Sequence, residues 1–270
     1  MRADDTRQHL LQRLLRKLRD PDKNTRAEAA VELGKLGDSS TADLLVEALA
    51  TEPDFFVREY LTWSIVRMAE AATPLLIRTL NDARPQARHG AAHTLSKIAD
   101  PRATSALIVT LQDADPTVVS KAAFALGAIG AVESVRALVN LLGGQDRELQ
   151  STLVSVLERF GAHALPAVVD ALGHADARVR AHAAEVLGVI ADSGSVVALA
   201  NTLADIEGDV RFAAVHALAN IGGEAATEAI RPMCDDADAR VSALAAKMLD
   251  RTKKPSRSRY SASSRPIKGN

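Results

Sequence analysis

The sequence has very little of several features, and each shortage excludes a class of protein. Cysteine occurs once, as Cys234, which rules out an intramolecular disulfide framework and favours a reducing compartment. No apolar run reaches the roughly 18 to 20 residues that a membrane-spanning helix needs. Residues 1–20 carry charges on every turn and lack the apolar centre of a secretory signal. We therefore expect a cytoplasmic protein that does not enter a membrane.

Aromatic residues are also scarce, at 3% of the chain, although 47% of its residues are hydrophobic. Ala, Leu and Val supply most of this apolar content, which suits closely packed helices. Arginine outnumbers lysine, a bias typical of GC-rich bacterial genomes. The formal net charge is −1, and residues 251–270 contain seven Lys or Arg and no acid, which leaves about −8 on residues 1–250. An acidic body is a poor match for the dense phosphates of nucleic acid.

A short pattern recurs along the chain every 30 to 32 residues. It begins with an acidic residue, which we number position 0, and continues with an apolar residue at +3, Arg at +4, a small pair at +7 and +8, and Leu at +11. These positions lie on one face of a helix, and an acidic residue is a good helix N-cap. Position 0 is occupied in the eight repeats by Asp22, Asp54, Arg84, Asp115, Asp146, Asp176, Glu207 and Asp238.

A second apolar segment follows each of these helices, as in residues 43–49 and 197–203. Each unit is therefore a helical hairpin with two apolar faces, and only stacking on neighbouring units can bury both. The sequence predicts an all-α fold that extends over residues 1–250. Within it, residues 1–19 are expected to form an N-terminal cap helix and residues 238–250 a final half repeat. Residues 251–270, rich in Ser, Arg, Lys and Pro, are expected to be a disordered basic tail.

The pattern resembles the HEAT-like repeat family, in the short form found in bacterial phycobilisome-lyase-type (PBS lyase) HEAT proteins. The segments DPTVVSKAAFALGAIG (115–130) and DARVRAHAAEVLGVI (176–190) carry the resemblance, which covers about residues 20–250. It implies an α-α superhelix, a right-handed solenoid of about seven to eight hairpins. It also implies a structural ladder, in which an acid two places before position 0 bonds the arginine at +4 across neighbouring repeats. The implied pairs are Asp20/Arg26, Glu52/Arg58, Asp82/Arg88 and Asp205/Arg211.

The fifth repeat departs from this ladder. Gly144 and Gln150 occupy its two ladder positions, and His174 replaces the acid of the sixth repeat. Glu158 stands where other repeats have a turn glycine. We hypothesise that this repeat marks a soft hinge or a change in the curvature of the superhelix.

The resemblance places the helix with the Val-Arg pattern on the concave face, where positions +5, +9 and +13 point outward. The only tryptophan and two of the five phenylalanines occupy such positions. Exposed aromatic residues flanked by charge are typical of protein-binding surfaces. The alternative is that Trp63 and Phe124 fold inward and fill the space between helices. The predicted partner-binding groove consists of Glu59, Tyr60, Trp63, Arg67, His89, His93, Lys97, Phe124, Phe212 and His216.

His89 and His93 are separated by one helical turn and can share a metal ion. Zinc needs three or four ligands, and Glu59 on the neighbouring helix is the candidate for a third. Since no further ligand is visible, we expect no metal here and interpret the pair as a polar contact patch that becomes cationic below the imidazole pKa.

These observations favour a non-enzymatic protein-binding scaffold or adaptor, monomeric and without a cofactor. The alternative is a HEAT-repeat enzyme subunit, such as a bilin lyase or isomerase. The sequence shows no nucleophile–base pair, phosphate-binding glycine loop or cysteine cluster. It also has none of the His-Glu dipeptides that ligate iron in HEAT-like hydroxylases.

A second alternative is nucleic-acid binding, as in the HEAT-like alkylpurine DNA glycosylases. That activity requires a basic concave face. The predicted groove instead mixes the acids Glu59 and Glu185 with basic residues. We expect nucleic acid not to be the partner.

Overall fold

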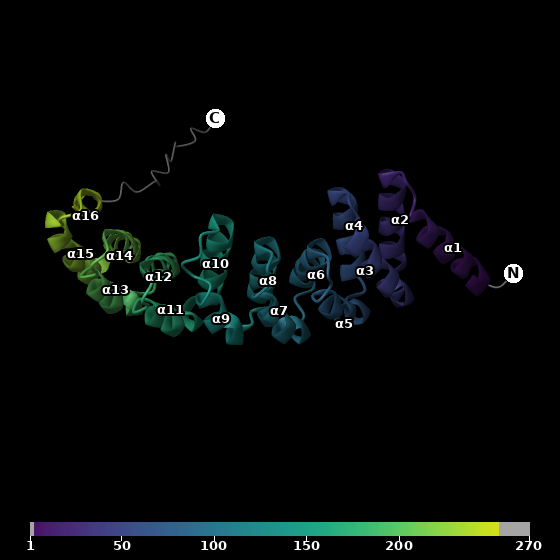
Figure 1. Ribbon diagram of the computed structural model, residues 1–270, viewed down its shortest axis with the longest axis horizontal. Coiled ribbons are helices and arrows are strands. Elements are labelled where there is room, and N and C mark those ends of the chain that lie inside the picture. Colours follow the sequence, from purple (N-terminus) through teal and green to yellow (C-terminus); the bar gives the residue numbers. More distant parts are fainter. Residues whose placement is uncertain (1–2, 254–270) are drawn as a thin grey trace, which may run out of the picture.

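The computed structural model describes residues 3–253, which form helices stacked in two rows without β-strands (Figure 1). The inner row consists of α2 (Lys23–Leu36), α4 (Phe55–Val66), α6 (Pro85–Ile98), α8 (Pro116–Ile129), α10 (Arg147–Phe160), α12 (Ala177–Ile190), α14 (Gly208–Ile221) and α16 (Ala239–Lys253). The outer row consists of α1 (Ala3–Lys17), α3 (Ala42–Thr51), α5 (Ala69–Thr79), α7 (Thr104–Thr110), α9 (Val135–Val139), α11 (Leu165–Ala171), α13 (Val196–Thr202) and α15 (Gly223–Ile230). Short 3₁₀ helices join them: η1 (Ser39–Thr41), η2 (Pro101–Ala103), η3 (Val132–Ser134), η4 (Gly161–His163), η5 (Ser193–Ser195) and η6 (Arg231–Asp235).

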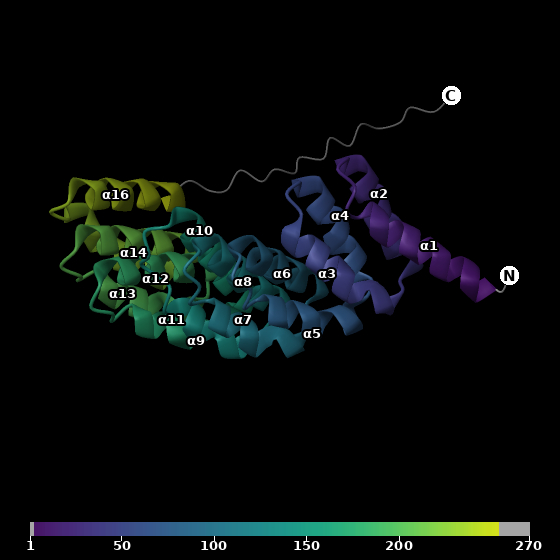
Figure 2. The same cartoon turned by 45° about the vertical axis from the view of Figure 1, so that its right-hand side comes forward.

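The two rows form a shallow arc, with the inner row on its concave side (Figure 1). Helix α1 projects beyond α2 at one end, and α16 lies at the other end (Figure 2). The predicted all-α superhelix of stacked hairpins is therefore confirmed. Helix α16 continues to Lys253, beyond the predicted end of the solenoid at residue 250. The remainder of the predicted disordered tail, residues 254–270, lies outside the described residues. None of the helices in residues 3–253 is long and apolar enough to cross a membrane.

Each inner helix begins at position 0 of the repeat pattern. The carboxylate of Asp54, for example, accepts hydrogen bonds from the amides of Phe56 and Val57, two of the amides that have no partner within the helix. Helices α2 and α8 end at Gly37 and Gly130, whose φ angles of 58° and 75° form left-handed caps. An aspartate at position 0 is therefore a structural cap, whereas Arg84 and Glu207 form no side-chain cap.

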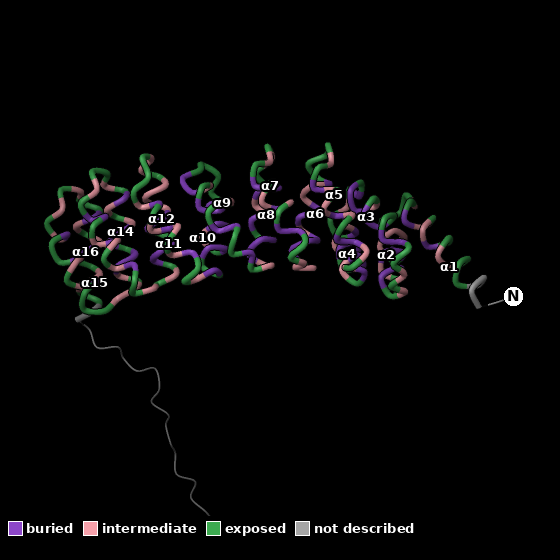
Figure 3. Tube along the Cα trace, turned by 90° about the horizontal axis from the view of Figure 1, so that it is seen from below, coloured by how far each residue is buried: buried purple, intermediate pink, exposed green. Residues whose placement is uncertain are grey.

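The apolar positions of the pattern build one continuous core between the two rows. At position +11, the side chain is fully buried in the first seven repeats, as in Leu33, Ile65, Leu126 and Leu187, and partly buried in the eighth, as Leu249. Buried segments follow the inside of the stack through every repeat, while exposed segments face away from it (Figure 3). Since each repeat packs on its neighbours, the stability of this fold depends on the interfaces between adjacent hairpins.

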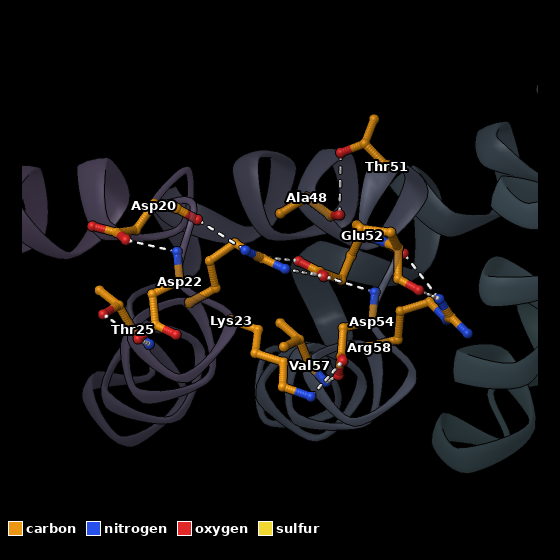
Figure 4. A network of polar contacts seen from close by, with 12 residues as sticks. Asp20, Asp22, Lys23, Thr25, Ala48, Thr51, Glu52, Asp54, Val57 and Arg58 are labelled. Atoms are coloured by element: carbon orange, nitrogen blue, oxygen red, sulfur yellow. Dashed lines mark hydrogen bonds and ion pairs between the residues drawn. The ribbon is translucent and has the colours of Figure 1, made fainter.

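The ladder joins adjacent repeats, and its register differs from the predicted one. In the first rung, Nε and Nη2 of Arg26 donate to the carboxylate of Glu52 in the next repeat, both at 2.8 Å (Figure 4). Nη1 of Arg26 donates to the backbone carbonyls of Asp20 and Pro21 at 2.9 and 3.0 Å. The arginine thus holds the backbone of its own repeat and the carboxylate of the following one.

The predicted ladder across neighbouring repeats is therefore present, but the four acid–arginine pairs named for it are wrong. The carboxylates of Glu52 and Asp205 bind the arginine of the preceding repeat, because the residue six places before a ladder arginine presents its carbonyl, not its carboxylate, to that arginine. Side-chain rungs are formed by Arg26–Glu52, Arg88–Asp113, Arg180–Asp205 and Arg211–Asp236. Arg58 keeps only the backbone contacts to Glu52 and Pro53. Its expected partner in the next rung, Asp82, is held by Arg84 at 2.8 and 2.9 Å.

The fifth repeat replaces the ion pair by neutral hydrogen bonds. The amide side chain of Gln150 donates to the carbonyl of Leu141 at 3.0 Å and accepts from the amide of Gly143 at 3.2 Å. His174 accepts from the amide of Asp176, so it retains the local turn but contributes no carboxylate. Within residues 3–253, no ladder ion pair joins this repeat to either neighbour.

We expect amide hydrogen exchange to be faster in α9–α11, residues 135–171, than in α12–α14. Each missing charged rung removes a hydrogen-bonded ion pair from the interface, and a difference of about 1.4 kcal/mol in local opening corresponds to tenfold in exchange rate. Exchange measured by mass spectrometry at neutral pH provides the comparison. Equal protection of the two segments would show that the fifth repeat is not a hinge.

Candidate protein-binding face

Helix α4 buries one side and exposes aromatic residues on the other. Its core face carries Val57, Leu61 and Ile65, all at most 2% exposed. The spacing of the outward residues follows the helical period, so they share one face of the helix. This face carries Phe56, Tyr60, Trp63 and Arg67, and Trp63 is 55% exposed. The inward-packing alternative for Trp63 is therefore wrong, and Phe124 on α8 is also exposed, at 42%.

A small pocket lies beside this face, between α2 and α4. Tyr60, Trp63 and Arg67 line one side of it, and its volume is about 270 Å³. The two helices approach closely because residue 34 is glycine: a Cβ there would lie 2.9 Å from Cα of Ser64. Nε of Arg67 donates to the carbonyl of Gly34 at 2.7 Å, which fixes the arginine at the pocket wall. The remaining lining residues are Val31, Gly34, Lys35 and Ser64.

The next inner helix, α6, places its outward side chains against α4. Nζ of Lys97 lies 6.0 Å from the centre of the Trp63 ring, within the range of a cation–π contact. Nε2 of His93 lies 3.2 Å from Oε1 of Glu59. The rings of His89 and His93 are nearly parallel, with centres 6.5 Å apart. Seven of the ten predicted groove residues are thus neighbours on α4 and α6.

The candidate metal ligands do not form a metal centre. Glu59 approaches His93, but no group of three or more His, Cys, Asp or Glu side chains among residues 3–253 is arranged to hold an ion. His89 instead lies in a positively charged environment, near Lys121 and Arg58. The pair is better described as a half-buried polar contact between α4, α6 and α8.

Burial and neighbouring positive charge keep both imidazoles neutral. Burial lowers the pKa of His89 to about 4, and the charges of Lys121, His93 and Arg58 act in the same direction. Burial also lowers the pKa of His93, although the carboxylate of Glu59 opposes this shift. Neither histidine is therefore expected to be a cation at neutral pH.

We expect the melting temperature of the protein to fall as the pH is lowered from 7 toward 4.5, in part because of His89. Since the folded-state pKa of His89 is below 6.5, the unfolded chain binds its proton first, and the stability present above pH 6.5 is lost as the pH falls toward 4. His89→Gln should reduce this fall, as measured by circular dichroism. The exposed His216→Gln serves as the control; equal pH profiles for wild type and His89→Gln would contradict the assignment.

Two predicted groove residues lie away from this cluster. Phe212 and His216 are exposed on α14, and α6, α8, α10 and α12 separate them from α4 along the stack (Figure 1). Nδ1 of His216 is 3.4 Å from the side-chain nitrogen of Asn220 on its own helix. They belong to the same inner row but not to the same binding patch. We call the patch on α4, α6 and α8, with its pocket beside α2, the aromatic face.

Some residues of the aromatic face lie outside the predicted groove. Lys121 lies at +6 of its helix, next to the positions inspected, yet its charge acts on both histidines. Arg58 was assigned to the ladder, but its guanidinium carbon lies 5.9 Å from the centre of the Phe55 ring. Phe55 and Phe56, which lie close to Trp63 in the sequence, are 59% and 67% exposed and pack edge to face at 5.5 Å. The outward arc of each helix, taken as a whole, includes Lys121 and Arg58.

The comparisons with known proteins identify the repeat family. The model of HEAT repeats matches residues 3–66, 72–158, 135–212 and 165–250, and no curated protein matches the chain. Among solved structures, Kap95p in its complex with RanGDP has a TM-score of 0.61 at 14% identity, with 89% of this chain and 40% of that chain covered.

Two further solved structures are similar in fold alone. Human deoxyhypusine hydroxylase in complex with glycerol has a TM-score of 0.41 at 21% identity, with coverage of 92% of this chain and 97% of that chain. The CpcE–CpcF complex of phycocyanin lyase from Nostoc sp. PCC7120 has a TM-score of 0.44 at 20% identity, with coverage of 89% and 94%. With a family model matching nearly the whole stack of hairpins, this chain belongs to the HEAT-repeat family.

Proposed function

We propose that this protein is a non-enzymatic binding scaffold whose aromatic face holds a partner protein. The observation that carries the proposal is the group of exposed aromatic side chains on α4, continued by Phe124 on α8. Large exposed aromatic residues are unfavourable in water and dominate the energetics of protein interfaces.

The arrangement of the face supports a macromolecular partner over a small substrate. The side chains are spread over three adjacent inner helices, and the pocket beside them is a shallow recess of about 270 Å³. Small-molecule sites are usually deeper, at about 300 to 1,000 Å³, with convergent polar groups. A partner lying across α4, α6 and α8 would cover the aromatic residues together.

Affinity capture from the native cells tests the proposal. The bait is the full chain, and the variant is Trp63→Ala/Phe124→Ala, which removes two exposed rings without opening the core. The matched control is Val109→Ala/Val197→Ala, which removes exposed apolar side chains from the outer row. We expect proteins captured by the wild type and the control to be lost by the aromatic variant.

The result that would overturn the proposal is an unchanged set of captured proteins with Trp63→Ala/Phe124→Ala. Circular dichroism of all three baits shows whether they remain folded, since a loss of helix would also abolish capture. A bait that is folded and still captures the same proteins places the binding site elsewhere.

A further inference from the structure

The aromatic face carries positive charges that have no carboxylate partner. Among the ion pairs that join Lys or Arg to Asp or Glu within the described residues, none involves Arg58, Arg67, Lys97 or Lys121. By contrast, Arg26, Arg88, Arg180 and Arg211 of the ladder and exposed arginines such as Arg102 and Arg178 each bind an acid. The four cations of the aromatic face are therefore available to the carboxylates of a partner.

Two of these cations lie over exposed aromatic rings, and a third lies one helical turn from such a ring. Lys97 lies over the ring of Trp63, and Arg58 lies over the ring of Phe55. Arg67 is one helical turn beyond Trp63 and is fixed by the carbonyl of Gly34. The exposed rings of Phe55 and Trp63 are thus each next to a positive charge.

The repeat pattern places positions +9 and +13 in two parallel rows across the helices. Position +9 is apolar in three of the first four inner helices, as Val31, Trp63 and Phe124, and is His93 in the third. Position +13 is Lys35, Arg67 and Lys97 in the first three, and Lys35 is paired with Glu32. Adjacent packed helices are about 8 to 10 Å apart. A chain that crosses them meets a mostly apolar row beside the cations Arg67 and Lys97.

We propose that the partner presents an acidic peptide segment whose apolar side chains anchor on the aromatic face. This inference rests on the proposed function and specifies its partner. Apolar side chains of the segment contact Trp63 and enter the pocket between α2 and α4, while its carboxylates pair with Arg67, Lys97 and Lys121. Complementary charge raises the association rate and selects the partner, and desolvated aromatic contacts supply the affinity.

The face fits an acidic peptide better than single-stranded nucleic acid. Nucleic-acid channels combine dense positive charge along the backbone with open aromatic faces for stacking bases. Here Lys97 lies over the ring of Trp63, and Glu59 is part of the same surface.

A random 12-residue peptide display library selected on the immobilised full chain tests the inference. Peptides that also bind Trp63→Ala are removed by subtraction. We expect the remaining peptides to be acidic and to contain Leu, Ile, Phe or Trp. Their dissociation constants are then measured by fluorescence anisotropy at 50 and 300 mM salt, beside labelled oligothymidine as the nucleic-acid probe.

The charge-reversal variant is Lys97→Glu/Lys121→Glu, and its matched control is Arg159→Glu. Arg159 occupies position +13 of the fifth repeat, where position +9 is Ser155 instead of an aromatic residue. We expect the double variant to weaken peptide binding about tenfold or more, the control to leave it within about twofold, and high salt to weaken it.

Selection of basic or uncharged peptides that still depend on Trp63 would overturn the acidic partner while leaving the proposed protein-binding function intact. Oligothymidine that binds more tightly than the selected peptides and depends on Trp63 would overturn both the acidic peptide partner and the proposed protein-binding function. Failure to enrich any Trp63-dependent peptide would overturn the peptide-segment inference, and the capture experiment would then decide the proposed function separately.

Discussion

Arg180→Ala is expected to lower the free energy of unfolding by about 3 kcal/mol, the loss associated with removing one partner of a buried ion pair. The guanidinium of Arg180 donates to both carboxylate oxygens of Asp205 at 2.7 and 2.8 Å, and to the carbonyls of His174 and Ala175. The two charged side chains are only 13% and 11% exposed. Its removal leaves Asp205 with one amide donor, from Glu207, in a site that water reaches poorly.

Arg178→Ala is the matched control, because Arg178 lies on the same helix, pairs with Asp176 and is 57% exposed. An exposed pair of this kind contributes about 0 to 1 kcal/mol. Urea unfolding of both variants gives the comparison. If the two substitutions cost the same, the ladder would not hold adjacent repeats together.

Gly188→Ala is expected to destabilise the protein by about 1 to 3 kcal/mol, although glycine-to-alanine changes inside helices usually stabilise by about 1 kcal/mol. A Cβ at residue 188 would lie 2.6 Å from Cα of Ala217 on the adjacent helix α14. Since the opposing atom belongs to the backbone, the clash is relieved only by separating α12 from α14. That separation opens the apolar contacts between two of the most regular repeats.

Gly90→Ala provides the control with the same chemical change inside helix α6. A Cβ there meets the flexible end of Leu49 at 3.4 Å, an ordinary contact distance. We expect this variant to be neutral or more stable than the wild type. Thermal unfolding followed by circular dichroism measures both, and a stabilised Gly188→Ala would contradict the close packing of α12 on α14.

The repeat architecture was predictable because the same local sequence signals recur along the chain. An acidic cap, a stripe of small and aliphatic residues and a terminal glycine recur at fixed spacing, so local signals alone define each inner helix. The ladder register was not predictable in the same way. The carbonyl and the carboxylate of residue 205 approach different arginines, Arg211 and Arg180, and only the rotation between successive hairpins decides which arginine each reaches.

The candidate site was predictable in outline from the helical period. Counting outward positions found Trp63, Lys97 and Phe124, all of which are exposed. It also grouped Phe212 with them, because a period specifies which face of a helix a residue occupies but not how far apart two repeats lie. The pocket beside Trp63 depends on the close approach of α2 and α4 at Gly34, a packing distance that the pattern does not encode.

The emission of Trp63 is the most direct test that the aromatic face binds a partner protein. It is the only tryptophan in the chain, so its fluorescence reports this face without labelling, provided that the titrant lacks tryptophan or is measured in parallel. We predict that titration with the captured partner shifts the emission to shorter wavelength, since burial removes water from an indole that is 55% exposed. The shift should saturate with the binding isotherm measured by calorimetry. Full calorimetric binding with unchanged Trp63 emission would contradict the account.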